Sequence, residues 1–113
     1  MTMLVEQDCQ AVSKGSPTLG NDEIPGLLTQ LHGWQLDDTG KVLTRCFRFK
    51  NYYKTIAFVN ATAWVSHQQD HHPDLEVGYN RCTVHFTTHS IGGLSLNDFI
   101  CAARFDALVP GNE

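Results

Sequence analysis

The feature that most constrains the fold is a pattern that occurs twice along the chain: two strand-like segments joined by turn residues and followed by a helix-like segment. The strand-like segments are residues 34–36 and 42–49 in the first occurrence, and 75–79 and 82–88 in the second. In residues 42–49 and 82–88 apolar and polar side chains alternate, which is typical of strands with one buried face. Strands joined by short turns pair antiparallel. The pattern therefore predicts an antiparallel sheet covered on one face by helices.

Three helix-like segments accompany these strands. The expected helices are a short one over residues 21–33, a long one over residues 51–69, and a last one from residue 95 onward. Ser95 and Asp98 have the spacing of a capping box at the start of the last helix. In the long helix, the stripe of Ile56, Val59 and Ala63 predicts the buried face, which is broadened on its flank by Phe58, Thr62 and Val65. The sequence thus predicts an α+β, two-layer domain of four antiparallel strands, in the order α-β-β-α-β-β-α.

The length and composition favour a single domain. The chain has 113 residues, 42% of them hydrophobic, which is enough for one core. Residues 1–20 show no sustained periodicity and contain the turn residues Gly15, Ser16, Pro17 and Gly20. We therefore expect a loosely ordered N-terminal tail over residues 1–20 and one domain over residues 21–113. The second hairpin of this domain is expected to turn at Asn80 and Arg81.

Charge and hydropathy exclude several classes of protein. The formal net charge is −4, whereas proteins that bind nucleic acid directly usually carry a basic surplus. The chain contains no apolar run long enough to cross a membrane, and its start lacks the pattern of a secretory signal. The four cysteines form no C-x-x-C pair and are expected to be reduced. These features predict a cytoplasmic protein without membrane or direct nucleic-acid contact.

Histidines gather in one part of the sequence. Five of the six histidines lie between positions 67 and 89, and four of these stand near Asp70 or Asp98. The candidate residues are His67, Asp70, His71, His72, His89 and Asp98. They lie around the expected end of the long helix, just after the last strand and at the start of the last helix. The fold can bring these three places together. Since histidine has an ordinary pKa near 6.5, such a group can donate and accept protons at neutral pH.

Structural and metal-binding interpretations compete with this hypothesis. A histidine near a helix C-terminus is favoured by the helix dipole, and Asp98 can serve only as a cap. His32 and His85 show no linked partners and are interpreted as structural. His67 and His71, four positions apart, could present two imidazoles to a metal ion, but Gln68 replaces the glutamate of H-E-x-x-H. The sequence therefore predicts neither a metal nor another cofactor.

The spacing of these residues resembles the signature of pterin-4a-carbinolamine dehydratases, a family also known as the dimerisation cofactor of a homeodomain transcription factor. The matching run is His67-x-x-x-His71-His72-Pro73, followed by Tyr79, His89 and Asp98. The similarity extends over roughly residues 22–108. His67 stands where the family usually has an acidic residue, and Leu75 stands near a position that is often aromatic. The two-layer antiparallel fold that the resemblance implies agrees with the fold expected from periodicity.

The resemblance implies a hydro-lyase that dehydrates 4a-hydroxytetrahydrobiopterin to quinonoid dihydropterin in tetrahydrobiopterin recycling. It makes His71 and His89 the proton-transfer pair, with His72 beside them holding the pterin. Asp70 would orient a histidine and raise its basicity. The remaining substrate-binding candidates implied by the resemblance are His67, Thr87, Thr88 and Asp98.

A second hypothesis is a binding module of the same fold without turnover, acting as a coactivator or assembly partner. The resemblance also implies a homodimer or homotetramer, and a four-stranded sheet has two edges to cover. Expected partners are thus a small pterin and further copies of the chain, and under the second hypothesis another protein.

Overall fold

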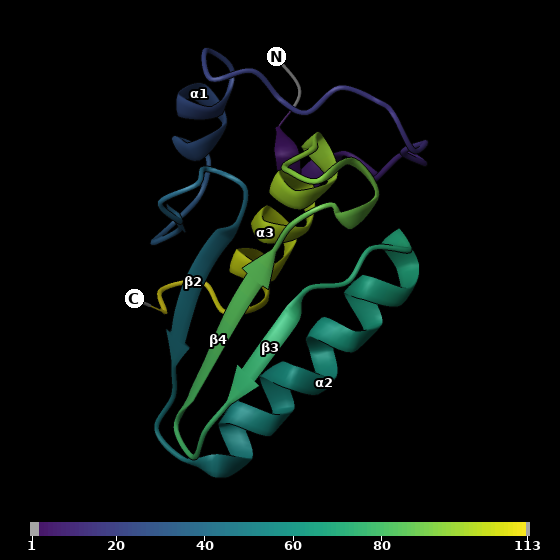
Figure 1. Cartoon of the computed structure of the whole chain (residues 1–113). Coiled ribbons are helices and arrows are strands. Elements are labelled where there is room, and N and C mark those ends of the chain that lie inside the picture. Colours follow the sequence, from purple (N-terminus) through teal and green to yellow (C-terminus); the bar gives the residue numbers. More distant parts are fainter. Residues whose placement is uncertain (1–2, 113) are drawn as a thin grey trace.

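The computed structural model describes residues 3–112, and its secondary structure follows the predicted order (Figure 1). The elements are a 3-10 helix η1 (Leu4–Glu6), α1 (Ile24–Leu28), β1 (Gln35–Leu36), β2 (Leu43–Arg48), α2 (Tyr52–Gln69), β3 (Asp74–Val77), β4 (Arg81–Phe86), a 3-10 helix η2 (His89–Ile91) and α3 (Leu96–Leu108). The predicted order of three helices and four strands is therefore confirmed, with two short 3-10 helices added.

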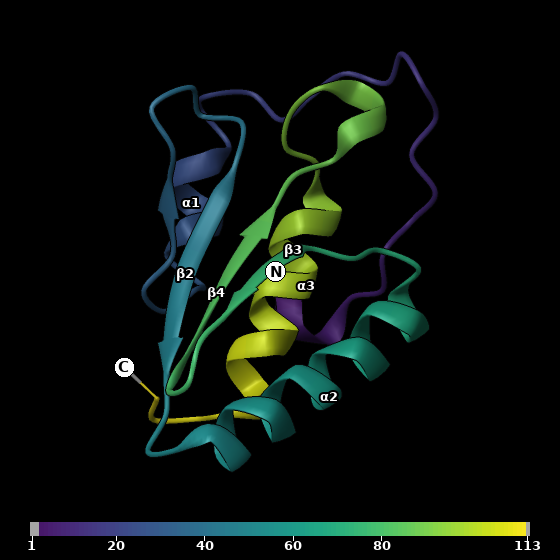
Figure 2. The same cartoon turned by 60° about the horizontal axis from the view of Figure 1, so that its bottom comes forward.

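The four strands form one antiparallel sheet in the order β1-β2-β4-β3. Alternate side chains of β2 and β4 point into the core, where Leu43, Phe47, Cys82, Val84 and Phe86 are fully buried. Phe58 of α2 stacks on Phe47, and Phe105 of α3 packs on Phe86. Both long helices therefore cover the same face of the sheet, as predicted (Figures 1 and 2).

The buried face of α2 is centred on the flank of the predicted stripe. Its buried residues are Thr55, Phe58, Thr62 and Val65, of which the last three were predicted on that flank. At the predicted centre, Ile56 and Val59 are only half-buried and Ala63 is exposed. In the structure, the Thr55 hydroxyl donates to the carbonyls of Asn51 and Tyr79, so that its burial leaves no polar atom unpaired.

Two further boundaries differ from those expected. The helix α1 ends at Leu28 rather than near Gly33, because the chain continues in tighter i→i+3 turns, with Leu31 N donating to the Leu28 carbonyl. In the second hairpin the turn lies one residue earlier than predicted. Gly78 N donates to the Arg81 carbonyl at 2.8 Å, and Arg81 already belongs to β4.

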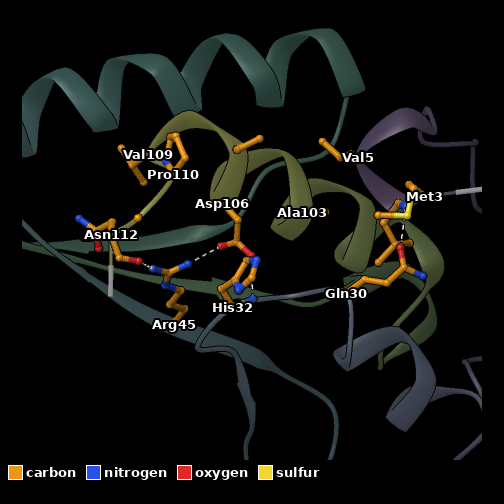
Figure 3. A pocket seen from close by; sticks show the side chains of 13 residues that line it. Met3, Val5, Gln30, His32, Arg45, Ala103, Asp106, Val109, Pro110 and Asn112 are labelled. Carbon is orange, nitrogen blue, oxygen red and sulfur yellow. Dashed lines mark hydrogen bonds and ion pairs between the residues drawn. The ribbon is translucent and has the colours of Figure 1, made fainter.

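A buried ion pair stands on the core face of the sheet, where the sequence suggested only apolar residues (Figure 3). Arg45 Nη1 lies 2.6 Å from Asp106 Oδ1, with the two side chains only 5% and 7% exposed. The same carboxylate accepts hydrogen bonds from Trp34 Nε1 at 2.8 Å and from the backbone N of His32 at 3.0 Å. The Arg45 guanidinium also lies 4.1 Å from the centre of the Phe47 ring. This network joins β2 to α3.

Residues 3–20 lie against the domain instead of extending from it (Figure 2). Leu4 is buried in the core, and its backbone N donates to Gln30 Oε1 at 2.9 Å. Leu19 N donates to the Leu94 carbonyl at 3.0 Å. The described part of the segment expected as a loose tail is therefore packed on α3, and residues 1 and 2 lie outside the described residues. Between residues 3 and 112 no helix has the length and hydropathy needed to cross a bilayer.

Candidate active site

The end of α2 places His71 beside the start of α3. The last helical residue is Gln69, and Asp70 follows in the left-handed region with a φ of 52°. His71 N then donates to the Ser66 carbonyl at 3.2 Å, which satisfies one of the free carbonyls at the helix end. Because the chain reverses its direction here, the His71 side chain turns toward α3.

His71 and Asp98 form the central pair of the site. His71 Nε2 lies 2.6 Å from Asp98 Oδ1, and the two side chains are 13% and 0% exposed. The His71 ring is parallel to the Phe86 ring, with the ring centres 5.8 Å apart and the planes 7° apart. The carboxylate and the aromatic ring together fix both the position and the tilt of the imidazole.

Asp98 is itself held by two other segments. Its Oδ2 accepts hydrogen bonds from Thr88 Oγ1 at 2.8 Å and from Ser95 N at 3.0 Å. The Thr88 and Ser95 hydroxyls are 2.7 Å apart. The predicted capping box is confirmed, and the same carboxylate orients His71. The direct contact with His71 is made by Asp98, and Asp70 acts on His71 only through its charge, which raises the pKa of the imidazole.

The surroundings of His71 favour its protonated form. Burial by itself lowers the pKa of His71, but the hydrogen bond and the charge of Asp98 oppose this effect, with smaller contributions from Cys9 and Asp70. The net result is that the pKa of His71 is raised above its ordinary value. Since Nε2 faces Asp98, Nδ1 is the ring nitrogen that remains for proton exchange with another molecule.

This raised pKa makes the stability of the fold dependent on pH. The protonated His71 stabilises the folded state, and this contribution is complete below the ordinary histidine pKa of about 6.5. It is lost as the pH rises through the higher pKa of the folded protein. We therefore expect the free energy of unfolding of the native chain, measured by urea titration, to fall with rising pH above about 6.5 relative to that of His71→Gln.

The control for this titration is Asp98→Asn, which removes the charge that raises the pKa of His71. The free energy of unfolding of Asp98→Asn should not fall above pH 6.5 relative to that of the double variant with Asp98→Asn and His71→Gln. A native chain whose stability rose over this range relative to His71→Gln would contradict the assignment.

The other two histidines expected to take part in catalysis lie at the surface. His72 is exposed and its Nδ1 lies 3.4 Å from the Pro73 carbonyl. His89 is exposed at the start of η2, directly after Thr88. His72 therefore directly follows His71 of the central pair, and His89 directly follows Thr88, whose hydroxyl contacts Asp98.

The remaining candidates differ in their surroundings. His67 is exposed and stacks on Trp64, with the ring centres 6.0 Å apart. The Thr87 hydroxyl donates to the Lys41 carbonyl at 2.7 Å, which fastens the end of β4 to the first hairpin. A hollow of about 430 Å³ lies between α2 and β3, and His67, His72 and Leu75 contribute to its lining. The structure therefore unites His71, Thr88 and Asp98 by direct contact but not His67 or Thr87.

The arrangement that the metal hypothesis requires does not occur. The helix ends at Gln69, so that His67 and His71 are not one turn apart on a helix. Within residues 3–112, no three His, Cys, Asp or Glu side chains are grouped so that they could hold a metal ion.

Sequence reasoning missed two contributors to these contacts and the partners of one histidine outside the site. Ser95 was recognised as a cap but not as a partner of Thr88, and Phe86 was assigned to the core without its stacking on His71. His85 was thought to have no partner, yet its Nε2 lies 2.5 Å from Glu76 Oε2 and its Nδ1 lies 2.9 Å from Thr44 Oγ1. The alternation of β4 places His85 on the open face, but its partners depend on the strand register.

Comparisons with known proteins identify the family of the chain. The sequence profile of the family described as "Pterin 4 alpha carbinolamine dehydratase" matches residues 17–108. A protein of Nitrosomonas eutropha named "Putative pterin-4-alpha-carbinolamine dehydratase" is 58% identical over 107 residues, which cover 94% of this chain and 93% of that protein. A protein of Stenotrophomonas maltophilia with the same name is 58% identical over 96 residues, covering 84% of this chain and 83% of the relative.

Two solved structures have the same fold. A transcriptional coactivator/pterin dehydratase from Brucella melitensis has a TM-score of 0.78 and 33% identity, covering 81% of this chain and 98% of its own. A pterin dehydratase-like protein, described as a RuBisCO assembly factor in the alpha-carboxysome, has a TM-score of 0.62 and 28% identity, covering 73% and 94%. On the profile match and the identity to its relatives, the chain belongs to the pterin-4-alpha-carbinolamine dehydratase family of hydro-lyases.

Proposed function

We propose that this chain dehydrates 4a-hydroxytetrahydrobiopterin to quinonoid dihydropterin by histidine acid/base catalysis, in the recycling of tetrahydrobiopterin. The observation that carries this proposal is the His71–Asp98 pair, a half-buried imidazole with one nitrogen fixed by a buried carboxylate. The family membership supports the substrate class.

The reaction removes one molecule of water and needs two proton transfers. The hydroxyl at C4a must receive a proton to leave as water, and the proton on N5 must be removed. Because the pKa of His71 is raised, this imidazole is suited to donate a proton from Nδ1 to the leaving hydroxyl. A second imidazole, for which we propose His89, accepts the proton from N5. Exchange with solvent then restores both histidines.

The other candidate residues are assigned to binding and support. His72, next to His71, is proposed to hold the pterin and assist proton transfer. Asp98 positions His71 through its contact with Nε2, and Thr88 holds Asp98 by donating to its Oδ2. For the polar edge of the pterin we propose contacts with Asp70, Thr87 and His67, of which Asp70 and His67 are exposed.

The direct test is a kinetic assay without added metal. The purified chain should accelerate the decay of enzymatically generated 4a-hydroxytetrahydrobiopterin, and the acceleration should persist with a chelator. Replacing both His71 and His89 by Ala should remove nearly all of it, since each proton transfer contributes about 10²–10⁴-fold. Full activity in the double variant would refute the assignment of the site, and loss of activity with the chelator would favour a metal enzyme.

A second candidate is a protein-binding or assembly function of the same fold. It is favoured by the structural neighbour described as a RuBisCO assembly factor. Exposed aromatic residues, among them Trp64 at 62% exposure, supply a surface on which a partner would bind. A folded native chain with no turnover in the kinetic assay would favour this candidate over the dehydratase.

We also propose a homodimer or homotetramer in the cytoplasm. Strands β1 and β3 are the two edges of the sheet, and edges that pair with a second copy are protected from aggregation. The four cysteines are free thiols, which fits a reducing compartment. Sedimentation analysis distinguishes the two oligomers, and a monomer at micromolar concentration would contradict both.

A further inference from the structure

Two thiols from distant parts of the chain lie side by side close to His71. Cys9 belongs to the N-terminal segment and Cys101 to α3, and their Sγ atoms are 3.5 Å apart. Cys101 is fully buried, whereas Cys9 is partly accessible to solvent. A disulfide bond is about 2.05 Å long, so an approach of roughly 1.5 Å would join them. The separation fits two thiols in contact without a bond.

Cys9 is held in place by hydrogen bonds on both sides. Its backbone N donates to Gln69 Oε1 at 2.7 Å, at the end of α2. The backbone of Gln10 exchanges two hydrogen bonds with the Asn97 side chain, of 3.0 and 2.7 Å. Arg104 Nη2 donates to the Gln7 carbonyl at 2.6 Å. The segment of residues 7–10, which we call the N-terminal strip, therefore presents Cys9 to α3 in a fixed position.

The two thiols are not equivalent in reactivity. The hydrogen bond from the Cys101 thiol lowers the pKa of Cys9, against the opposing effect of burial, and the charges of His71 and Arg104 lower it further. The hydrogen bond to Cys9, burial and the charge of Asp98 raise the pKa of Cys101. Because the thiolate is the reactive form, Cys9 is the nucleophile that attacks an oxidant. Cys101 is the resolving thiol, which attacks the oxidised Cys9 sulfur in a second step.

We propose that Cys9 and Cys101 form a peroxide-sensitive pair that closes to an intramolecular disulfide and ties the N-terminal strip to α3. The Cys9 thiolate attacks one oxygen of hydrogen peroxide; the S–O bond forms, the O–O bond breaks, and the hydroxide released takes the proton of Cys101. The Cys101 thiolate then attacks the Cys9 sulfur, the S–S bond forms, and the second hydroxide leaves and is protonated to water. Two thiols lose two electrons, and one peroxide becomes two waters.

The position of this pair links it to the candidate active site. Cys101 Sγ lies 3.9 Å from the His71 carbonyl, and the strip contacts Gln69, two residues before His71. The disulfide would remove both S–H donors and fasten the strip beside the turn that positions His71. The proposal concerns the thiols alone, so it stands or falls independently of the dehydratase activity.

The test treats the full chain with hydrogen peroxide and measures intact mass, the cross-linked peptide and Tm. We expect a loss of two hydrogen atoms per chain, a single peptide pair joining Cys9 to Cys101, and a rise in Tm of roughly 10 °C that a dithiol reductant reverses. Cys46→Ser is the matched control and should behave as the native chain does. Cys82 should remain reduced, since burial raises the pKa of its thiol to about 11.

Two variants distinguish oxidation of the Cys9–Cys101 pair from unspecific oxidation of thiols. Cys9→Ser should form no cross-link and show no peroxide-dependent rise in Tm. Cys101→Ala should leave Cys9 as a sulfenic acid that a cyclic dione reagent captures. Since Cys101 is buried and its replacement could impair folding, Cys9→Ser, at a partly accessible position, is the deciding variant. Cross-links to Cys46 or between chains, or equal thiol loss in the native chain and Cys9→Ser, would overturn the proposal.

Discussion

Replacing His71 by Gln is expected to lower kcat/KM for dehydration by about 10²–10⁴-fold. The amide of glutamine can donate to Asp98 in place of Nε2, so that the carboxylate keeps a partner. What the variant lacks is a group that exchanges a proton near neutral pH. The measurement is the decay of enzymatically generated 4a-hydroxytetrahydrobiopterin, followed spectroscopically at saturating and limiting substrate.

His85→Gln is a matched control for this variant. His85 also pairs with a carboxylate, that of Glu76 at 2.5 Å, but on the open face of the sheet. Its replacement should leave kcat/KM within about twofold of the native value, since it touches no proposed site residue. If the two variants lost activity equally, the special role of the His71–Asp98 pair would be refuted.

Replacing Asp106 by Ala is expected to lower the free energy of unfolding by about 3–5 kcal/mol, because it leaves the Arg45 guanidinium buried without its counter-charge. Trp34 Nε1 and His32 N lose their acceptor as well. Tm should fall by roughly 12 °C or more. Urea denaturation followed by tryptophan fluorescence and circular dichroism measures the effect.

Asp8→Ala is the control for this variant, because it removes the carboxylate of an ion pair that is exposed to solvent. Asp8 is paired with Arg104 at 3.2 Å, but its side chain is 76% exposed. Water screens such a pair, and we expect a loss of about 1 kcal/mol or less. An Asp106 variant no less stable than the Asp8 variant would show that the buried network contributes nothing to the fold.

The fold was largely predictable because its signals are local. The alternation of Cys82, Val84 and Phe86 and the Ser95–Asp98 capping box each act within a few residues, and each is confirmed. The buried face of α2 was predicted in part, but Thr55 was missed because a threonine becomes suitable for burial only through acceptors for its hydroxyl, here the Asn51 and Tyr79 carbonyls. Arg45 was missed because its partner, Asp106, lies 61 residues away in the sequence.

The site was predictable in its residue types but less so in its pairings. The spacing of His71, His89 and Asp98 pointed to proton transfer, and the structure joins His71 to Asp98. Which carboxylate would meet His71 depended on the left-handed turn at Asp70, where a single residue redirects the chain. Neither the stacking of His71 on Phe86 nor the contact of Cys9 with Cys101 follows from spacing, since both depend on how α3 packs.

Because three segments share the Asp98 carboxylate, the candidate active site forms only when these segments dock during folding. This one group is bonded to Thr88, two residues after β4, to Ser95 at the N-cap of α3, and to His71, two residues after α2. A chain that has formed its helices and hairpins separately, without docking them, has no oriented imidazole. Catalytic activity should therefore appear in the same cooperative folding step as the native core. Local unfolding of the first turn of α3 should abolish the activity while most of the secondary structure persists.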